Sequence, residues 1–238
     1  MTITSPEADQ IRAARLAGAM YLITMGTGIF GQSFVRGSLL VRGDATQTAL
    51  NIIESERLFR VGIATDLITF TGVVVLIWAL YVLLRPAGKN LALLAVLFRL
   101  VEVAVHYVAV LFSLSALVLL SGADYLAPLG EDQLHALARV ALNTQGAGLN
   151  LGFVLLGLGS AAFAYLFLRS RYVPKILAGW GVFASLLLSA SAIAVILFPA
   201  VGRFVLAAMV PMFIYEVTLG FWLLLKGAKI RPDSTSAA

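Results

Sequence analysis

Residues 91–120 read LALLAVLFRLVEVAVHYVAVLFSLSALVLL, an almost uninterrupted apolar stretch of 30 residues. A helix needs about 20 mostly apolar residues to span the hydrocarbon core of a bilayer, so this stretch is long enough to cross one. Five further stretches of the same character predict five more spanning helices. The six predicted spans are residues 16–35, 58–84, 91–120, 146–168, 176–198 and 204–225.

The composition of the whole chain indicates that its solvent is lipid. Of the 238 residues, 61% are hydrophobic and 12% are charged, whereas soluble domains average about 45–50% apolar and about 25% charged residues. A water-soluble core of this length cannot bury so much apolar surface. We therefore predict an all-α, polytopic membrane protein, a single membrane domain over residues 1–238 built as a bundle of six transmembrane helices in a lipid bilayer.

The connections between the predicted spans differ in charge, which indicates their orientation. The turns 85–90 and 169–175 contain basic residues and no acids, whereas the connections 36–57 and 121–145 contain six acidic residues. Basic residues collect in cytoplasmic loops. This assignment places ten Lys and Arg residues inside and six, Arg36 among them, outside. We expect a multi-pass protein of the bacterial cytoplasmic (inner) membrane with both termini in the cytoplasm, namely a short N-terminal segment (1–13) and a polar tail (229–238).

Two parts of the outer connections have helical character. We expect residues 131–145 to extend the fourth span and residues 45–57 to extend the second.

Glycines inside the predicted spans indicate close helix packing. Gly26-Thr27-Gly28-Ile29-Phe30-Gly31 matches the dinucleotide-binding pattern G-x-G-x-x-G, but it lies inside an apolar span with no strand before it, so we interpret it as a packing surface. Gly148 and Gly152, followed by Gly157 and Gly159, form a second small-residue surface on the fourth span.

The sequence provides few residues for metal or covalent chemistry. Cysteine is absent and there are only two histidines, His106 and His135, which argues against disulfides, thiolate metal sites and a multi-histidine metal centre. We expect no metal, no cofactor and no nucleic-acid partner.

The third span contains three ionisable residues that share one face. Arg99, Glu102 and His106 are spaced by three and four residues, which places them on one stripe of a helix. Each ionisable side chain inside a membrane costs about 2.5–3.5 kcal/mol on insertion scales and suggests a functional site. With a rise of about 1.5 Å per residue, Arg99 and Glu216 both lie about 15 Å from the cytoplasmic helix ends, whereas Asp66 and Asn150 lie about 28 Å away, near the level of His106.

These depths predict a connected polar column through the bundle. Three carboxylates in it face one fixed cation, Arg99, together with His106, so protonation or a ligand cation is needed to balance the charge. The candidate residues for ligand binding or a proton pathway are Arg60, Asp66, Arg99, Glu102, His106, Asn150 and Glu216.

Three functions remain open on the sequence. The preferred hypothesis is binding or proton-linked transport of a small molecule. An alternative is an intramembrane enzyme acting on a lipid-like substrate, with Glu102 or Asp66 as base and His106 as its partner. The sequence has no Ser-x-x-Lys, His-Glu-x-x-His or G-x-S-x-G motif, so we lean against an enzyme. The third is a non-catalytic accessory subunit of a membrane complex, in which the charges form an ion pair that fixes helix packing. A homo-oligomer also stays open as a state of assembly.

Several short motifs resemble one family over residues 14–225. They are Ala14-Arg15-Leu16-Ala17-Gly18, Glu56-Arg57-Leu58-Phe59-Arg60, Leu84-Arg85-Pro86, Phe98-Arg99-Leu100-Val101-Glu102 and Arg169-Ser170-Arg171-Tyr172-Val173-Pro174. The chain resembles a family of bacterial integral membrane proteins catalogued as domain of unknown function 4386. Val173 and Ala178 stand where the family pattern leads us to expect Leu and Gly. The resemblance implies a six-helix membrane protein and brings no catalytic residue or cofactor.

Overall fold

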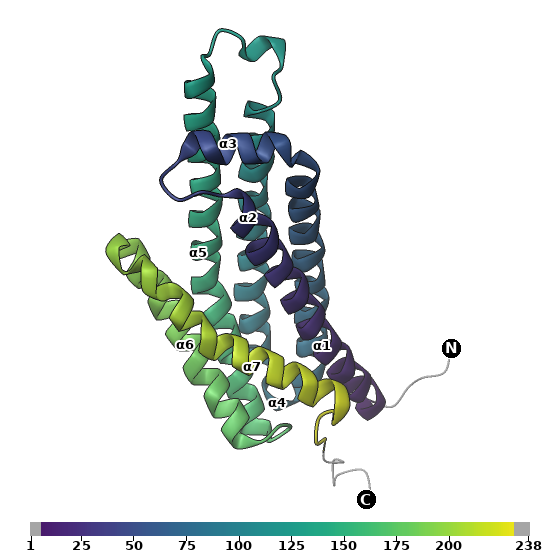
Figure 1. The fold of residues 1–238 in the computed structure, drawn as a ribbon. Helices are drawn as coiled ribbons and strands as arrows, with labels where there is room; N and C mark the ends of the chain where they lie inside the picture. Colours follow the sequence, from purple (N-terminus) through teal and green to yellow (C-terminus); the bar gives the residue numbers. More distant parts are fainter. Residues whose placement is uncertain (1–5, 231–238) are drawn as a thin grey trace, which may run out of the picture. The chain divides into compact units, whose positions relative to one another are not determined.

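The computed structural model describes residues 6–230, and within that range every regular element is a helix (Figure 1). The predicted all-α class is confirmed. Residues 1–5 of the expected N-terminal segment and residues 231–238 of the expected polar tail lie outside the described residues. The elements are α1 (Pro6–Ile29), η1 (Phe30–Arg36), α2 (Gly37–Leu39), α3 (Ala45–Glu54), α4 (Glu56–Leu119), η2 (Asp124–Leu126), α5 (Glu131–Ser170), α6 (Lys175–Leu197), η3 (Pro199–Phe204) and α7 (Val205–Leu225).

Five helices in the described part of the chain are long and apolar enough to cross a membrane. They are Glu7–Leu39, Glu56–Leu119, Glu131–Ser170, Lys175–Leu197 and Ala207–Leu225. One of them, α4, has 64 residues and is interrupted at Gly88, where the backbone is extended (φ 170°, ψ 88°), two residues after Pro86. The interruption divides α4 into two helical arms, which contain the second and third apolar stretches of the sequence.

The connections 36–57 and 121–145 are helical in different ways. Residues 131–145 form the first part of α5, as predicted. Residues 45–57 do not extend the second span, because α3 ends at Glu54 and the backbone at Ser55 is not helical (φ −116°, ψ 37°). The start of α3 is fixed locally, since the Asp44 carboxylate accepts a 2.8 Å hydrogen bond from the backbone N–H of Gln47 and caps the helix.

The chain divides into two compact units. Unit 1 contains the described residues 6–23, Gly72–Glu102 and 153–230, and unit 2 contains Thr24–Thr71 and Val103–Gly152.

Unit 1 is held together by an apolar core and by close helix contacts. Helices α6 and α7 pack against each other near the end where they are connected (Figure 1). A Cβ atom on Gly157 of α5 would lie 2.4 Å from the backbone oxygen of Ser185 on α6, and one on Gly18 of α1 would lie 2.4 Å from the backbone nitrogen of Leu224 on α7. Such distances allow only glycine, so the predicted packing role of Gly157 is confirmed.

Unit 2 also contains close contacts at small residues. A Cβ atom on Gly148 of α5 would lie 2.9 Å from the Cβ of Ala109 on α4. In the Gly26–Gly31 motif the three glycines differ, because a Cβ on Gly26 would meet nothing within 4 Å whereas one on Gly31 would lie 3.3 Å from the Asp66 carboxylate. Only Gly31 therefore has a tight neighbour.

Large apolar side chains are exposed on both units. Trp78 and Ile176 of unit 1 are 58% and 89% exposed, and Phe34 and Leu111 of unit 2 are 67% and 58% exposed. A soluble monomer rarely exposes so many large apolar side chains. A hydrocarbon environment removes this cost, which agrees with the length and apolarity of the helices.

Candidate functional site

Unit 1 contains a buried ion pair within one helix. Arg99 and Glu102 lie one turn apart on α4, their side chains are 4% and 2% exposed, and Arg99 Nη1 lies 3.1 Å from Glu102 Oε2. The spacing of three residues brings the two side chains to neighbouring positions on the helix surface. The stripe predicted from the sequence thus forms a direct ion pair.

A glycine on the neighbouring helix provides the space for Arg99. A Cβ atom on Gly159 of α5 would lie 2.7 Å from Arg99 Cγ and 2.9 Å from Arg99 Cδ. Any larger residue at position 159 would displace the aliphatic part of the arginine side chain. The packing surface of α5 and the charged face of α4 are therefore complementary.

Glu216 on α7 belongs to the same group of charges. Its carboxylate interacts electrostatically with Arg99 and with Glu102, as expected from the similar depths of Arg99 and Glu216. Among the described residues, Glu102 forms the direct ion pair with Arg99 and Glu216 acts at longer range. We call Arg99, Glu102 and Glu216 the acidic cluster, because one guanidinium faces two carboxylates.

Two buried tyrosines adjoin the acidic cluster and were not selected from the sequence. Tyr21 on α1 and Tyr215 on α7 are 4% and 1% exposed, and both interact electrostatically with Glu216. The Tyr215 ring fills the space beside Gly181 on α6, where a Cβ atom would lie 2.3 Å from the ring. Tyrosines are common in apolar helices, so no sequence signal marked these two.

Unit 2 contains a second buried ion pair, between Arg36 and Asp66. Arg36 Nη2 lies 2.5 Å from Asp66 Oδ2 and Arg36 Nη1 lies 3.2 Å from Oδ1, so the contact is bidentate. Arg36 Nη2 also donates to Ser113 Oγ at 3.4 Å. Arg36 and Asp66 are 6% and 3% exposed, and Ser113 is fully buried.

This pair corrects the assignment of Arg36 to an outer connection. The helix that begins in α1 continues through seven residues of π-helix (Phe30–Arg36), in which the Gly37 amide donates to the Gln32 carbonyl five residues earlier. A π-helical segment changes the direction of the side chains that follow it, and Arg36 is buried rather than exposed. Asp66 therefore has a fixed cation, and the surplus of carboxylates lies in the acidic cluster of unit 1.

His106 is enclosed in unit 2 by neighbours on two helices. Its ring packs on Phe70 with the centroids 4.9 Å apart, and Nε2 lies 3.3 Å from the Leu149 carbonyl oxygen. A Cβ atom on Gly152 would lie 2.0 Å from His106 Nε2, so glycine is required beside the ring. Asn150, which is half-buried, lies on the same turns of α5 as Leu149 and Gly152.

Arg60 lies on the surface of unit 2, apart from the buried residues. Its guanidinium forms an ion pair with Glu56 one turn earlier (Nε–Oε1 2.6 Å), and the two side chains are 59% and 52% exposed.

The seven candidate residues thus divide between the two units. Arg99, Glu102 and Glu216 come together in unit 1, whereas Arg60, Asp66, His106 and Asn150 lie in unit 2. A continuous column through all seven stays a prediction. Within residues 6–230, no three His, Asp or Glu side chains gather in an arrangement that could hold a metal ion.

The fold and these buried charges define a class: an all-helical protein with several helices apolar enough for a membrane protein. The chain matches the family described as a domain of unknown function (DUF4386) over residues 16–227, and it belongs to that family. The resemblance inferred from the short motifs is therefore confirmed. Neither the curated proteins nor the solved structures contain a match to this chain.

Proposed function

We propose that the chain crosses the bacterial cytoplasmic membrane six times, with both termini in the cytoplasm. The spans are α1 continued into η1, the two arms of α4, then α5, α6 and α7. The interruption at Gly88 divides the 64 residues of α4 into two arms of nearly equal length. Each arm measures about 48 Å, which is long enough to cross the hydrocarbon core of about 30 Å once. The interruption at Gly88 lies in the basic turn 85–90, which supports a cytoplasmic location for that turn.

We propose further that the protein binds a small molecule and couples its binding or transport to a proton. The observation behind this proposal is the composition of the acidic cluster, in which Arg99 faces both Glu102 and Glu216. With both carboxylates ionised the cluster has a net charge of −1, and an unbalanced charge in a membrane interior is costly. One proton or one ligand cation restores neutrality.

The two ways of reaching neutrality exclude each other. A cationic ligand that enters the acidic cluster makes the proton unnecessary, and the proton that leaves restores the same net charge. Such an exchange links ligand entry to proton release through charge balance alone. The residues needed for it are the two carboxylates, while Arg99 fixes their positions.

The competing hypothesis is that the acidic cluster only fixes helix packing, as in an accessory subunit of a membrane complex. The two hypotheses differ in their response to conservative substitutions. Glu102→Gln and Glu216→Gln keep the size of the side chains and can donate a hydrogen bond as a protonated glutamate does, but they remove the exchangeable charge. Loss of a proton-linked signal with retained folding favours exchange, since an ion pair that only fixes helix packing gives no proton-linked signal in the native protein.

The test uses purified protein reconstituted in vesicles that enclose a pH-sensitive dye. A panel of small organic amines and quaternary ammonium ions is added outside, and the internal pH is recorded. We expect at least one cation to produce a pH change that is lost in Glu102→Gln and Glu216→Gln. Glu56→Gln, in the exposed pair with Arg60, is the matched control and retains the signal. A panel without any signal, or a signal equal in all variants, contradicts the proposal.

A further inference from the structure

Unit 2 contains a pocket of about 620 Å³ with a cationic lining. It lies between the segment that follows α1 and the first half of α5. No carboxylate is among its lining residues, whereas three arginines and three amide side chains are. These six polar residues are Gln32, Arg36, Arg42, Arg139, Asn143 and Gln145.

Two buried nitrogen donors in this lining have no acceptor among the described residues. Gln145 is 3% exposed and its Nε2 makes no hydrogen bond, and the same holds for Nε of Arg36, which is 6% exposed. The two Nη atoms of Arg36 donate hydrogen bonds to Asp66 and Ser113. The remaining donor of this guanidinium is Nε. A buried donor without an acceptor destabilises the fold unless a ligand supplies the acceptor. Both donors belong to residues that line the same pocket.

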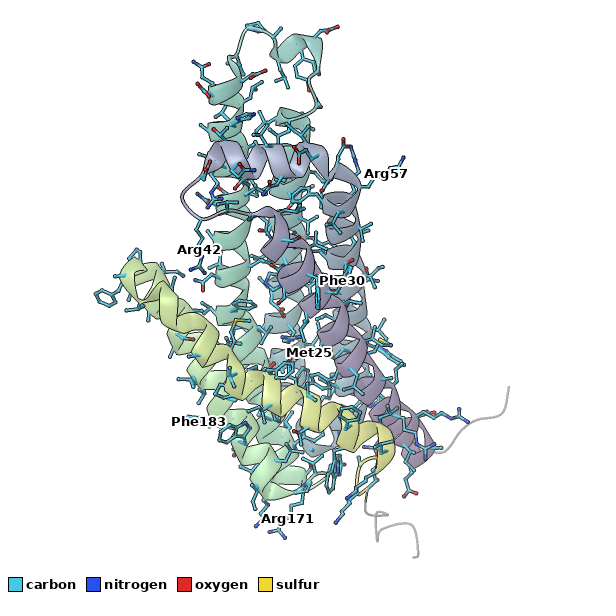
Figure 2. All side chains as sticks on the ribbon, viewed as in Figure 1. Met25, Phe30, Arg42, Arg57, Arg171 and Phe183 are labelled. Carbon is cyan, nitrogen blue, oxygen red and sulfur yellow. The ribbon has the colours of Figure 1, made fainter. Side chains whose placement is uncertain are left out.

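The other two arginines add positive charge to the pocket. Arg139 is held in place, because its Nη1 donates to the Val41 carbonyl at 2.9 Å and to Thr48 Oγ1 at 3.2 Å. Arg42 lies exposed on the loop between α2 and α3, next to a turn at Gly43 (φ 78°) (Figure 2). Since Asp66 neutralises Arg36, the charge left for a ligand is that of Arg42 and Arg139.

We propose that this pocket binds an anionic phosphate group. Arginine forks and amide N–H groups are the donors that suit the oxygens of such groups, and the volume is within the range of small-molecule sites. A phosphate group can come from a phospholipid headgroup or from a soluble anion, and the chemistry of the pocket is the same for both. The pocket shares no residue with the acidic cluster, so this proposal stands independently of the proposed exchange.

Binding is measured in two arms that separate the sources. In the first, inorganic phosphate is titrated into the detergent-solubilised protein and the heat of binding is recorded. In the second, native mass spectrometry counts the lipids retained after extraction from nanodiscs of phosphatidylglycerol or of phosphatidylcholine. If the ligand is a soluble anion, we expect a heat of binding in the phosphate titration. If it is a lipid headgroup, we expect preferential retention of phosphatidylglycerol.

Three variants give the test its specificity. Arg42→Gln removes one charged donor from an exposed side chain and is expected to weaken binding about tenfold, the effect of losing one charged hydrogen bond. Gln145→Leu weakens binding without changing the net charge. Arg57→Gln is the control, because Arg57 is exposed at the start of α4 on the opposite side of unit 2 from Arg42 and is not in the pocket lining (Figure 2).

The result that supports the proposal is weaker binding in Arg42→Gln and Gln145→Leu together with unchanged binding in Arg57→Gln. An equal effect of Arg42→Gln and Arg57→Gln overturns it, because diffuse surface charge then explains the binding. Absence of phosphate binding combined with equal retention of the two lipids also overturns it. Thermal unfolding of each variant shows that the fold is intact.

Discussion

Arg99 on α4 lies in the space left by Gly159 on α5, where a Cβ atom would approach Arg99 Cγ to 2.7 Å. The same relationship recurs in unit 2 between His106 and Gly152, where the distance to Nε2 would be 2.0 Å. In both cases a small residue on α5 accommodates a buried ionisable side chain of α4. The glycines of α5 therefore serve the polar residues as well as the close approach of the helices.

Alanine at position 159 is expected to destabilise the protein by about 1–3 kcal/mol, the usual cost of adding atoms to a packed interior. The added Cβ would also approach the backbone oxygen of Ala95 to 3.1 Å, so displacement of the Arg99 side chain does not remove the whole strain. Thermal unfolding in detergent measures the change. Gly179→Ala on α6 is the matched control, since a Cβ there meets nothing within 4 Å. Equal stability of the two variants contradicts the tight contact.

The stability of the protein is expected to depend on Arg36 and Asp66 together, so that losing one partner is worse than losing both. Arg36→Gln or Asp66→Asn alone leaves one buried group without its partner and is expected to cost about 3–5 kcal/mol. The double variant removes both charges, so its loss of stability should be much smaller than the sum of the two. A double-mutant cycle on unfolding free energies checks this, and additive effects would show that the two side chains do not interact.

The proposed orientation can be tested directly, because the chain contains no cysteine that would interfere with labelling. Tyr125→Cys places a thiol at a residue that is 70% exposed, in the connection 121–145. Asn90→Cys places one in the basic turn after Gly88. A membrane-impermeant maleimide added to intact cells should label position 125 and spare position 90, and both should react after permeabilisation. The reverse pattern would invert the topology.

Much of the fold followed from the sequence because it depends on properties of single helices. The length of each apolar stretch predicts a span, and the spacing of Arg99, Glu102 and His106 places them on one face. The small residues Gly148, Gly152, Gly157 and Gly159 all proved to be points of close approach. Each of these inferences needs only the periodicity of one helix.

The partners across helices could not be predicted in the same way. Arg36 and Asp66 are 30 residues apart, and periodicity does not indicate which helix faces which. The π-helical segment before Arg36 also shifts the register that an α-helical count would give. Tyr21 and Tyr215 lie beside the acidic cluster only because of the tertiary packing of α1 and α7. The cationic pocket arises from a loop and a helix that are about 100 residues apart, so no local pattern marked it.

The proposed exchange requires that Glu102 and Glu216 together hold one exchangeable proton when no cation occupies the acidic cluster. Infrared difference spectroscopy of the purified protein during a pH titration detects the carbonyl band of a protonated carboxylic acid. We expect such a band in the native protein near pH 7, where exposed carboxylates are ionised. It should be lost at that pH in either Glu102→Gln or Glu216→Gln, because the remaining carboxylate then balances Arg99. Glu56→Gln, which affects only the exposed pair with Arg60, should keep the band. A native protein without the band, or a band that persists in both glutamine variants, would show that Glu102 and Glu216 do not share a proton.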